Sequence, residues 1–359
     1  MAEPYKKRLL ELRKKMKLKN TDAVLVTKRE NYLYLSGFTG SSACLFISGQ
    51  RAVLLTDFRY VEQAAAQAPE YEIVQYIGNN IGELNDLVEK EKVEKLSFEE
   101  GHLTCKEQAE FAGKLKVSAF TPLDGVIEEL RRTKDESEIE RIKEAVRIAD
   151  DVYAHILGFI KPGVAEVELA AEMEYFMRRQ GATGPSFETI VASGKRASMP
   201  HGVASEKKIE AGDVITMDYG VLYKGYCSDI TRTVFLGKPD RELEKIYRIV
   251  LDAQLKGIAA VRQGILGKDA DAVARAAITE AGHGDNFGHG LGHGVGLEIH
   301  EEPMLSMRGT VELRDGMVVT VEPGIYVPGL GGVRIEDMVV VNGDSARILT
   351  TAPKEFTVL

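Results

Sequence analysis

Apolar residues in the first part of the chain alternate between short runs and helical spacing. Six runs of aliphatic and β-branched residues predict strands, and three segments with apolar positions at helical spacing predict helices. The expected strands cover residues 23–27, 43–47, 52–56, 71–76, 95–98 and 116–120, and the expected helices cover 59–67, 81–92 and 104–115. Thr104 and Glu107 form a capping box at the start of the last helix. This alternation predicts an α/β domain.

The pattern changes after Thr121-Pro122. Residues 123–160 are charged and helical in pattern, and Lys161-Pro162-Gly163 is expected to end this segment because Pro and Gly stop helices. We therefore place a domain boundary after Pro122, with one domain over residues 1–122 and a second over residues 123–359.

The second domain contains an internal repeat. Residues 147–164 align with residues 248–265 at an offset of 101. A spacing of 18 between glycines also recurs, from Gly163 to Gly181 and from Gly264 to Gly282. Each half is predicted to be two helices followed by strands, around one curved sheet with a pseudo-two-fold axis. Chance similarity between amphipathic helices is the alternative, and the matched glycine spacing argues against it.

Two strands joined at Lys224-Gly225 each carry an aspartate. If these two residues form the hairpin loop, Asp218 lies opposite Thr231 and Asp229 lies opposite Gly220. Side chains alternate along a strand, so both carboxylates share one face as diagonal neighbours, roughly 7–8 Å apart at the backbone. Such carboxylates repel unless they share a proton or bind cations. The alternative is a solvated acidic hairpin.

The second half of the repeat supplies a matching pair of carboxylates. Strands expected at residues 317–327 and 333–341 carry Glu322 and Glu336. A glutamate on a strand of valine and isoleucine is costly to bury without a partner. Arg334 shares the face of Glu336 and could neutralise it as a simple ion pair. That alternative stays open for one carboxylate, but it does not account for four of them on repeated strands.

A glycine-rich segment, residues 286–303, adds His289, His293 and His300. Its glycines allow close backbone approach to a ligand. They do not follow a strand and open a helix, as a dinucleotide fingerprint requires. Four carboxylates and one imidazole suit two divalent ions about 3.5–4 Å apart, bridged by a hydroxide. Carboxylate-rich ligation favours Mn²⁺, Co²⁺ or Fe²⁺ over a structural zinc site.

Composition excludes several classes of function. The net charge of −9, without a basic block to offset it, argues against a nucleic-acid partner. The basic segment of residues 6–19 has only a modest apolar stripe, so a helix packed on its own domain is favoured over a membrane-surface helix. We expect no signal peptide and no membrane span. Cys44, Cys105 and Cys227 predict buried thiols in a reducing cytoplasm.

The motifs MDYG…SDITRT, GHGLGHGVGLEIHE, VEPGIY and VRIEDM together resemble the proline-specific members of the pita-bread metallopeptidase family, over about residues 125–359. The segments NYLYLSGFTGS and TDFRY resemble the N-terminal domain shared by Xaa-Pro aminopeptidases, prolidases and creatinase. The resemblance implies a creatinase/prolidase-like α/β domain followed by an α+β pita-bread catalytic domain. It also implies a homodimer and two divalent ions per subunit, with Mn²⁺ or Co²⁺ first and Fe²⁺ or Zn²⁺ as alternatives.

The resemblance further implies roles for individual residues. The metal ligands would be Asp218, Asp229, His293, Glu322 and Glu336. Glu322 would also assist proton transfer from the attacking water. His201, in the segment SMPHG, and His300 would contact the substrate carbonyl and the tetrahedral intermediate. His289 and Arg334 would help to form the pocket for proline.

We predict an Xaa-Pro aminopeptidase, in which a hydroxide activated by two metal ions hydrolyses the bond between an N-terminal residue and a following proline in small peptides. The first alternative is an Xaa-Pro dipeptidase, which must block the space beyond proline and hold its free carboxylate. A metal-free hydrolase of the creatinase type and a non-catalytic binding module are further alternatives. The complete set of five ligands disfavours the last two.

Overall fold

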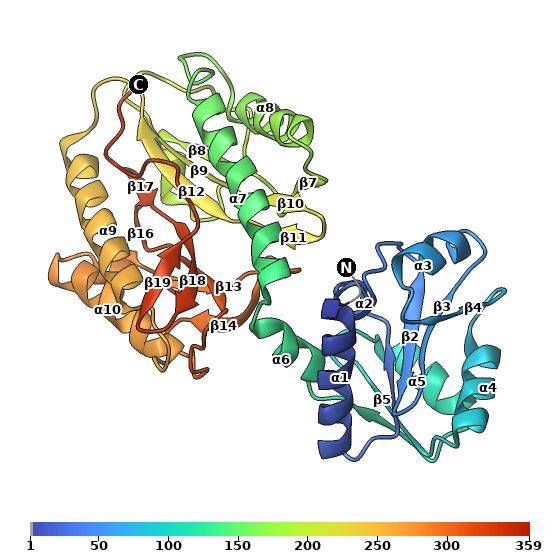
Figure 1. Ribbon diagram of the computed structural model, residues 1–359. Helices are drawn as coiled ribbons and strands as arrows, with labels where there is room; N and C mark the ends of the chain where they lie inside the picture. Colours follow the sequence, from blue (N-terminus) through green and yellow to red (C-terminus); the bar gives the residue numbers. More distant parts are fainter. Residues whose placement is uncertain (1–2) are drawn as a thin grey trace. The chain divides into compact units, whose positions relative to one another are not determined.

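The computed structural model describes residues 3–359 and divides into two compact units, Met1–Arg131 and Arg132–Leu359 (Figure 1). The division follows Arg131, whereas the sequence placed it after Pro122. Helix α6 (Val126–Arg132) accounts for the difference, because its side chains bind the N-terminal unit. Asn31 donates to Glu128 at 2.7 Å and accepts from Arg131 at 2.6 Å.

The N-terminal unit is built on a mixed sheet with strand order β4-β3-β2-β1-β5-β6. The strands are β1 (Ala23–Val26), β2 (Ala43–Ser48), β3 (Ala52–Thr56), β4 (Glu72–Gln75), β5 (Lys95–Phe98) and β6 (Ala119–Pro122). The helices before α6 are α1 (Glu3–Leu18), α2 (Arg29–Ser36), α3 (Val61–Gln67), α4 (Ile81–Glu91) and α5 (Cys105–Lys114). The predicted α/β class and the capping box of α5 are confirmed. Helix α2 was not predicted because residues 31–36 are all buried and show no polar face.

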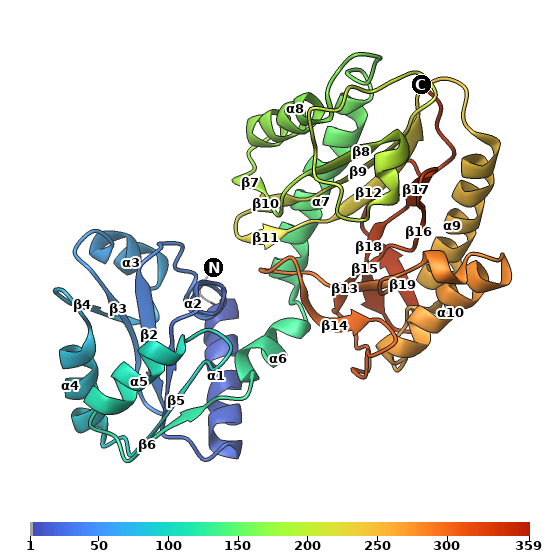
Figure 2. The same cartoon turned by 180° about the vertical axis from the view of Figure 1, so that it is seen from behind.

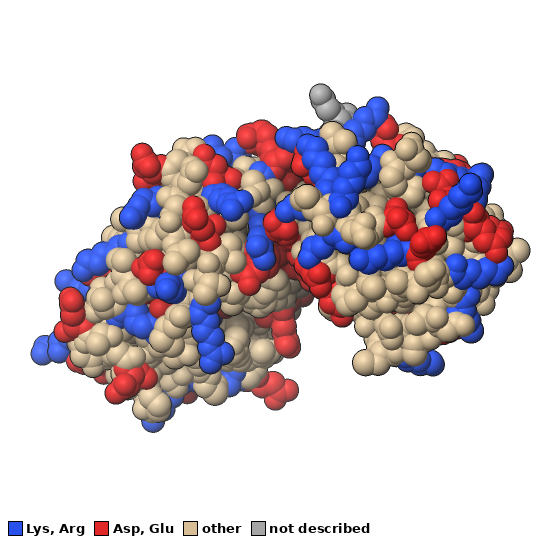
Figure 3. Space-filling view, turned by 90° about the horizontal axis from the view of Figure 1, so that it is seen from below, with Lys and Arg blue, Asp and Glu red and all other residues tan. Residues whose placement is uncertain are grey.

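The basic segment forms α1 and packs on its own unit. Leu9, Leu12 and Met16 are buried, and α1 contacts α2. Several of its lysines pair with carboxylates, including Lys15 with Glu129 at 2.7 Å. On the face shown in Figure 3, cationic and anionic side chains are interspersed. Within residues 3–359, no helix is long and apolar enough to span a membrane.

The C-terminal unit contains two helix pairs, each followed by an antiparallel sheet. The pair α7 (Glu136–Ile156) and α8 (Glu166–Arg179) precedes the sheet of β8 (Ile190–Ser193), β9 (Val214–Tyr219) and β12 (Ile230–Phe235). The pair α9 (Arg241–Ala260) and α10 (Gly267–Glu280) precedes the sheet of β13 (Gly292–Gly294), β14 (Glu301–Leu305), β15 (Val318–Val321), β18 (Asp337–Asn342) and β19 (Ser345–Ile348). The strands lie between the two helix pairs (Figures 1 and 2). The predicted pita-bread repeat is confirmed.

The repeat is close in detail. Helix α10 begins and ends 101 residues after α8. Gly181 and Gly282 follow these helices with φ of 96° and 88°, a left-handed conformation that suits glycine at a helix C-terminus. The offset is 104 residues at the strands, since β9 starts at residue 214 and β15 at residue 318. Asp218 therefore corresponds to Glu322.

Shorter elements complete the C-terminal unit. They are β7 (Gly184–Pro185), β10 (Val221–Tyr223), β11 (Tyr226–Cys227), β16 (Gly324–Val327) and β17 (Gly331–Arg334), with the 3₁₀ turns η1 (Gly194–Ser198) and η2 (Gly284–Asn286). One apolar cluster lies under α7 and α8, and a second lies under α9 and α10. Each helix pair therefore covers the outer face of its own sheet, and the opposite faces are free to build a site.

Candidate functional site

The aspartate hairpin has the predicted register. Asp218 pairs with Thr231, and the turn residues Lys224 and Gly225 have φ of 47° and 87°. The hairpin is interrupted twice. Gly220 separates β9 from β10, and Asp229 lies between β11 and β12. A Cβ at residue 220 would lie 2.0 Å from the backbone oxygen of Ser228. Glycine is therefore required at the point where the hairpin bends.

The two glutamates lie where strands break. The predicted continuous strands at 317–327 and 333–341 are wrong, because β15 ends before Glu322 and β18 begins after Glu336. Pro323 cannot donate to a ladder, which explains the first break. Interruptions of this kind change the direction in which a side chain points. Here they allow Glu322 and Glu336 to turn toward the aspartate hairpin.

Three carboxylates meet in the buried centre of the unit. Asp218, Asp229 and Glu336 each offer an oxygen within 4.8 Å of the other two. The Thr231 hydroxyl donates to Glu336 at 2.8 Å. Asp218 Oδ1 and Glu336 Oε1 are buried and have no hydrogen-bond partner among the described residues. Unpaired buried carboxylate oxygens are costly. A divalent cation would satisfy them, so this donor set fits a metal.

His293 and Glu322 lie next to Asp229 and extend the cluster. The His293 Nε2 atom lies 3.2 Å from Glu322 Oε1 and 3.6 Å from Asp229 Oδ2. The Nδ1 atom of His293 lies 3.1 Å from the carbonyl oxygen of Gly294, which favours a proton on Nδ1 and leaves Nε2 free as a ligand atom. The Thr320 hydroxyl donates to Glu322 at 3.0 Å, so these two residues share a face.

Arg334 binds a different carboxylate from the one considered in the sequence. Its Nη2 atom pairs with Asp218 Oδ2 at 2.6 Å, and not with Glu336. Its other nitrogens donate to the Tyr326 hydroxyl at 2.6 Å and to the Thr231 hydroxyl at 3.0 Å. A simple Arg334–Glu336 ion pair is therefore wrong, and Glu336 keeps an oxygen for another cation.

The protonation of the cluster reflects crowding of negative charge. Burial raises the pKa of Asp229 and of Glu336 well above the usual range, and neighbouring carboxylates raise both further. Burial also raises the pKa of Asp218, against the opposing effect of Arg334. Burial acts to raise the pKa of Glu322, but the hydrogen bond and charge of His293 lower it below its usual value. A cluster that resists full ionisation by itself is suited to cations.

A cavity of about 980 Å³ opens onto this cluster. Every predicted site residue lines it except Glu336, which lies buried. His201 and His300 are exposed on its wall, and the ring of His300 lies 4.4 Å from that of His293 between centroids. His289 Nε2 lies 2.9 Å from the Tyr326 hydroxyl. The arrangement can hold divalent cations at the base of a cavity that presents imidazole rings and apolar side chains to a ligand.

Sequence reasoning missed two supporting residues. Tyr326 connects Arg334 with His289, and burial raises its pKa to about 12, so the hydroxyl stays protonated. Met338 accepts a hydrogen bond through sulfur from the backbone of Asp229 at 3.2 Å. Asp229 lies 109 positions away from Met338 in the chain, so no local pattern joins the two. Tyr326 lies four positions after Glu322, so side-chain alternation along a strand would place both on one face and could have identified Tyr326.

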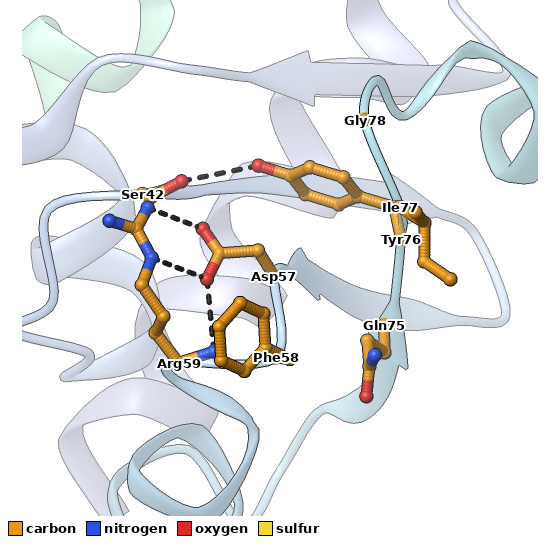
Figure 4. A pocket seen from close by; sticks show the side chains of 8 residues that line it. All are labelled: Ser42, Asp57, Phe58, Arg59, Gln75, Tyr76, Ile77 and Gly78. Atoms are coloured by element: carbon orange, nitrogen blue, oxygen red, sulfur yellow. Dashed lines mark hydrogen bonds and ion pairs between the residues drawn. The ribbon is translucent and has the colours of Figure 1, made fainter.

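A second hollow lies in the N-terminal unit and has different chemistry. It is lined by Ser42, Asp57, Phe58, Arg59, Gln75, Tyr76, Ile77 and Gly78 (Figure 4). The Asp57 carboxylate is already paired with the Arg59 guanidinium, which donates to both of its oxygens. No candidate metal cluster lies here among residues 3–359. The cavity of the C-terminal unit is therefore the candidate active site.

The cysteines are not part of this site. Cys44 and Cys227 are buried as predicted. Cys105 is exposed, contrary to prediction, because it starts α5, a helix without buried residues. Cys227 faces the carbonyl of Leu297 and does not line the cavity.

Two family models match the chain. The model for metallopeptidase family M24 matches residues 140–343, and the model for the creatinase/prolidase N-terminal domain matches residues 8–133. Together they span both units, and their order agrees with the architecture described above.

Individual relatives cover almost the whole chain. An Xaa-Pro dipeptidase of Pyrococcus furiosus is 41% identical over 98% of this chain and 99% of its own length. The structure of an Xaa-Pro dipeptidase from Bacillus anthracis is 48% identical, with a TM-score of 0.97 over 99% of this chain and 100% of that one. The structure of an X-Pro aminopeptidase from Thermotoga maritima is 40% identical, with a TM-score of 0.91 over 96% and 100%.

Proposed function

The chain belongs to metallopeptidase family M24, and on this premise we propose that it is an Xaa-Pro dipeptidase that hydrolyses dipeptides with proline at the second position. The observation that carries the proposal is the cluster of four carboxylates and His293 at the base of a cavity, in a chain similar over nearly its full length to proteins named Xaa-Pro dipeptidases. The aminopeptidase preferred from sequence becomes the second candidate. The Thermotoga maritima structure is the observation in its favour.

We propose that Asp218, Asp229, His293, Glu322 and Glu336 hold two divalent cations, Mn²⁺ or Co²⁺ in the first instance. The unpaired oxygens of Asp218 and Glu336 support this assignment. When bound, such cations supply Lewis-acid stabilisation of a developing oxyanion and lower the pKa of water.

The remaining steps belong to side chains of this protein. Glu322 lines the cavity beside His293, and its carboxylate can accept the proton of the attacking water. The same carboxyl can return that proton to the proline nitrogen as the C–N bond breaks. Burial and the nearby His293 lower the pKa of His300, so it is neutral and can donate one N–H to the carbonyl oxygen.

His201, His289 and Arg334 would position the substrate. His201 lies on the cavity wall beside His300 and can donate to the same oxygen. His289 and Arg334 are tied to the Tyr326 hydroxyl, so the three form one rigid wall. We assign this wall to the proline ring, because a preformed surface costs less ordering on binding.

The decisive experiment compares Ala-Pro with Ala-Pro-Ala after loading the protein with Mn²⁺ or Co²⁺. A dipeptidase cleaves the dipeptide and leaves the tripeptide intact. Release of alanine from the tripeptide at a comparable kcat/KM would establish the aminopeptidase instead. The variant His293→Ala is the control, and it should cleave neither peptide.

Two further properties stay proposals. We propose a homodimer, which light scattering after size-exclusion chromatography would test, with a monomer as the contrary result. We also propose the cytoplasm as the compartment, because no pair of the three cysteines forms a disulfide.

A further inference from the structure

A buried ion pair lies on the far side of the strands that carry Thr231 and Glu336. Arg232 on β12 and Asp337 at the start of β18 are each 1% exposed. The Arg232 Nη2 atom donates to Asp337 Oδ1 at 2.8 Å. Side chains alternate along a strand, so Arg232 points away from the carboxylate cluster, where Thr231 donates to Glu336. A buried pair is tolerated only when its other polar atoms are satisfied.

The guanidinium of Arg232 has all of its donors satisfied, and its acceptors come from two places. Its Nη1 atom donates to the backbone carbonyls of Thr231, at 3.0 Å, and of Glu336. Its Nε and Nη2 atoms donate to the carbonyls of Pro353 and Ala352 at 3.0 and 2.8 Å. One side chain therefore links the backbone of Glu336 to the end of the chain.

The carboxylate of Asp337 completes the same link. It accepts from the Thr350 hydroxyl at 2.6 Å, from Gln254 at 2.9 Å and from Lys354 Nζ at 2.5 Å. Lys354 Nζ also donates to Gln254 Oε1 at 3.0 Å. We call residues 350–354 the C-terminal strap. It supplies one hydroxyl, one ammonium group and two carbonyls to the ion pair.

The strap has separate anchors that do not touch Asp337. The carboxylate of Asp150 accepts from the backbone N–H groups of Thr351 and Ala352 at 2.8 and 2.9 Å. The Tyr247 hydroxyl lies 3.1 Å from the carbonyl of Lys354. Anchoring of the strap and support of Asp337 can therefore be separated by mutation.

We propose that Lys354, carried on the C-terminal strap, is a positioning residue for Glu336. With Arg232 it holds Asp337 in place, and so fixes the main chain from which Glu336 reaches the carboxylate cluster. Lys354 does not line the substrate cavity, and it acts through Asp337, directly and by way of Gln254. The inference rests on the proposed function in one respect, the role of Glu336 as a ligand to a divalent cation.

The test measures metal binding rather than turnover. Isothermal titration with MnCl₂ compares the wild type with Lys354→Met and Lys354→Arg, and the visible absorption of the Co²⁺-loaded proteins reports ligand geometry. We expect Lys354→Met to weaken Mn²⁺ binding about tenfold, as residues that orient ligands commonly do, and to shift the Co²⁺ bands. Lys354→Arg keeps the charge and a donor, so it should restore both readouts. Wild-type affinity and bands in Lys354→Met would overturn the inference.

Tyr247→Phe is the matched control. It removes a hydrogen bond to the backbone of the strap and leaves Asp337 untouched. We expect its thermal unfolding temperature to fall while Mn²⁺ binding stays at the wild-type value. Equal weakening in both variants would mean that order in the strap alone matters, and would contradict the role of Lys354. A wild type that binds no Mn²⁺ would contradict the proposed function itself, which is a distinct outcome.

Discussion

Asp229 is the carboxylate that the two parts of the cluster share. One of its oxygens lies within 4.8 Å of an oxygen of Asp218 and of Glu336, and its Oδ2 atom lies 3.6 Å from His293 Nε2. We predict that Asp229→Asn loses metal binding at one site or both and lowers kcat/KM by orders of magnitude, because a neutral amide is a weaker ligand for a divalent cation than a carboxylate. Titration with MnCl₂ and the Ala-Pro assay check this. Full activity in Asp229→Asn would contradict the assignment.

Protons and cations compete for the same carboxylates. Burial raises the pKa of Asp229 and of Glu336, so without cations both retain protons where free carboxyls are ionised. A cation must displace these protons. Apparent Mn²⁺ affinity should therefore keep rising with pH above about pH 4, where free carboxyls are already ionised. Calorimetry in two buffers of different ionisation enthalpy would measure proton release, and release of none would contradict the prediction.

Glu166, at the N-terminal end of α8, holds a loop of the candidate site in place. It is the first residue of α8 and is fully buried. Its carboxylate accepts from the backbone and hydroxyl of both Ser193 and Ser205, and from Arg196 Nε at 2.9 Å. These residues flank the loop that carries His201. One carboxylate therefore fixes both ends of that loop.

We predict that Glu166→Ala destabilises the protein by ~3–5 kcal/mol, because Arg196 and the serine donors lose their partner. Activity should fall further than the folded fraction explains, since His201 would no longer be held on the cavity wall. Urea unfolding and the Ala-Pro assay on the folded protein measure the two effects. Glu172→Gln, on the same helix, removes the charge of a partly exposed carboxylate beside His155 and should change stability by only about 0.5 kcal/mol. Equal effects of the two variants would refute this account.

The elements that follow local rules were predictable from sequence. The six strands of the N-terminal unit, the repeated helix pairs and the hairpin register at Asp218 all follow from periodicity and glycine spacing. The strand breaks at Glu322 and Glu336 were not predicted, although Pro323, which cannot donate to a ladder, marks the first of them in the sequence. The second break, between β17 and β18, has no comparable local marker. Partner choice was equally hidden, since Arg334 lies two residues from Glu336 yet binds Asp218 across 116 positions.

The two units have separate apolar cores, and this decides how the whole molecule should unfold. Among the described residues, one apolar cluster lies within residues 23–120, and two more lie within residues 145–356. Units with cores of their own can unfold as separate transitions.

The candidate cation ligands all belong to the C-terminal unit, so a cation stabilises only the transition of that unit, by about 2.7 kcal/mol at a hundredfold excess over Kd. Differential scanning calorimetry with EDTA or with MnCl₂ should therefore show one transition that moves upward and one that stays. If both move together, the units unfold as one; if neither moves, the carboxylate cluster does not bind Mn²⁺ in the folded protein.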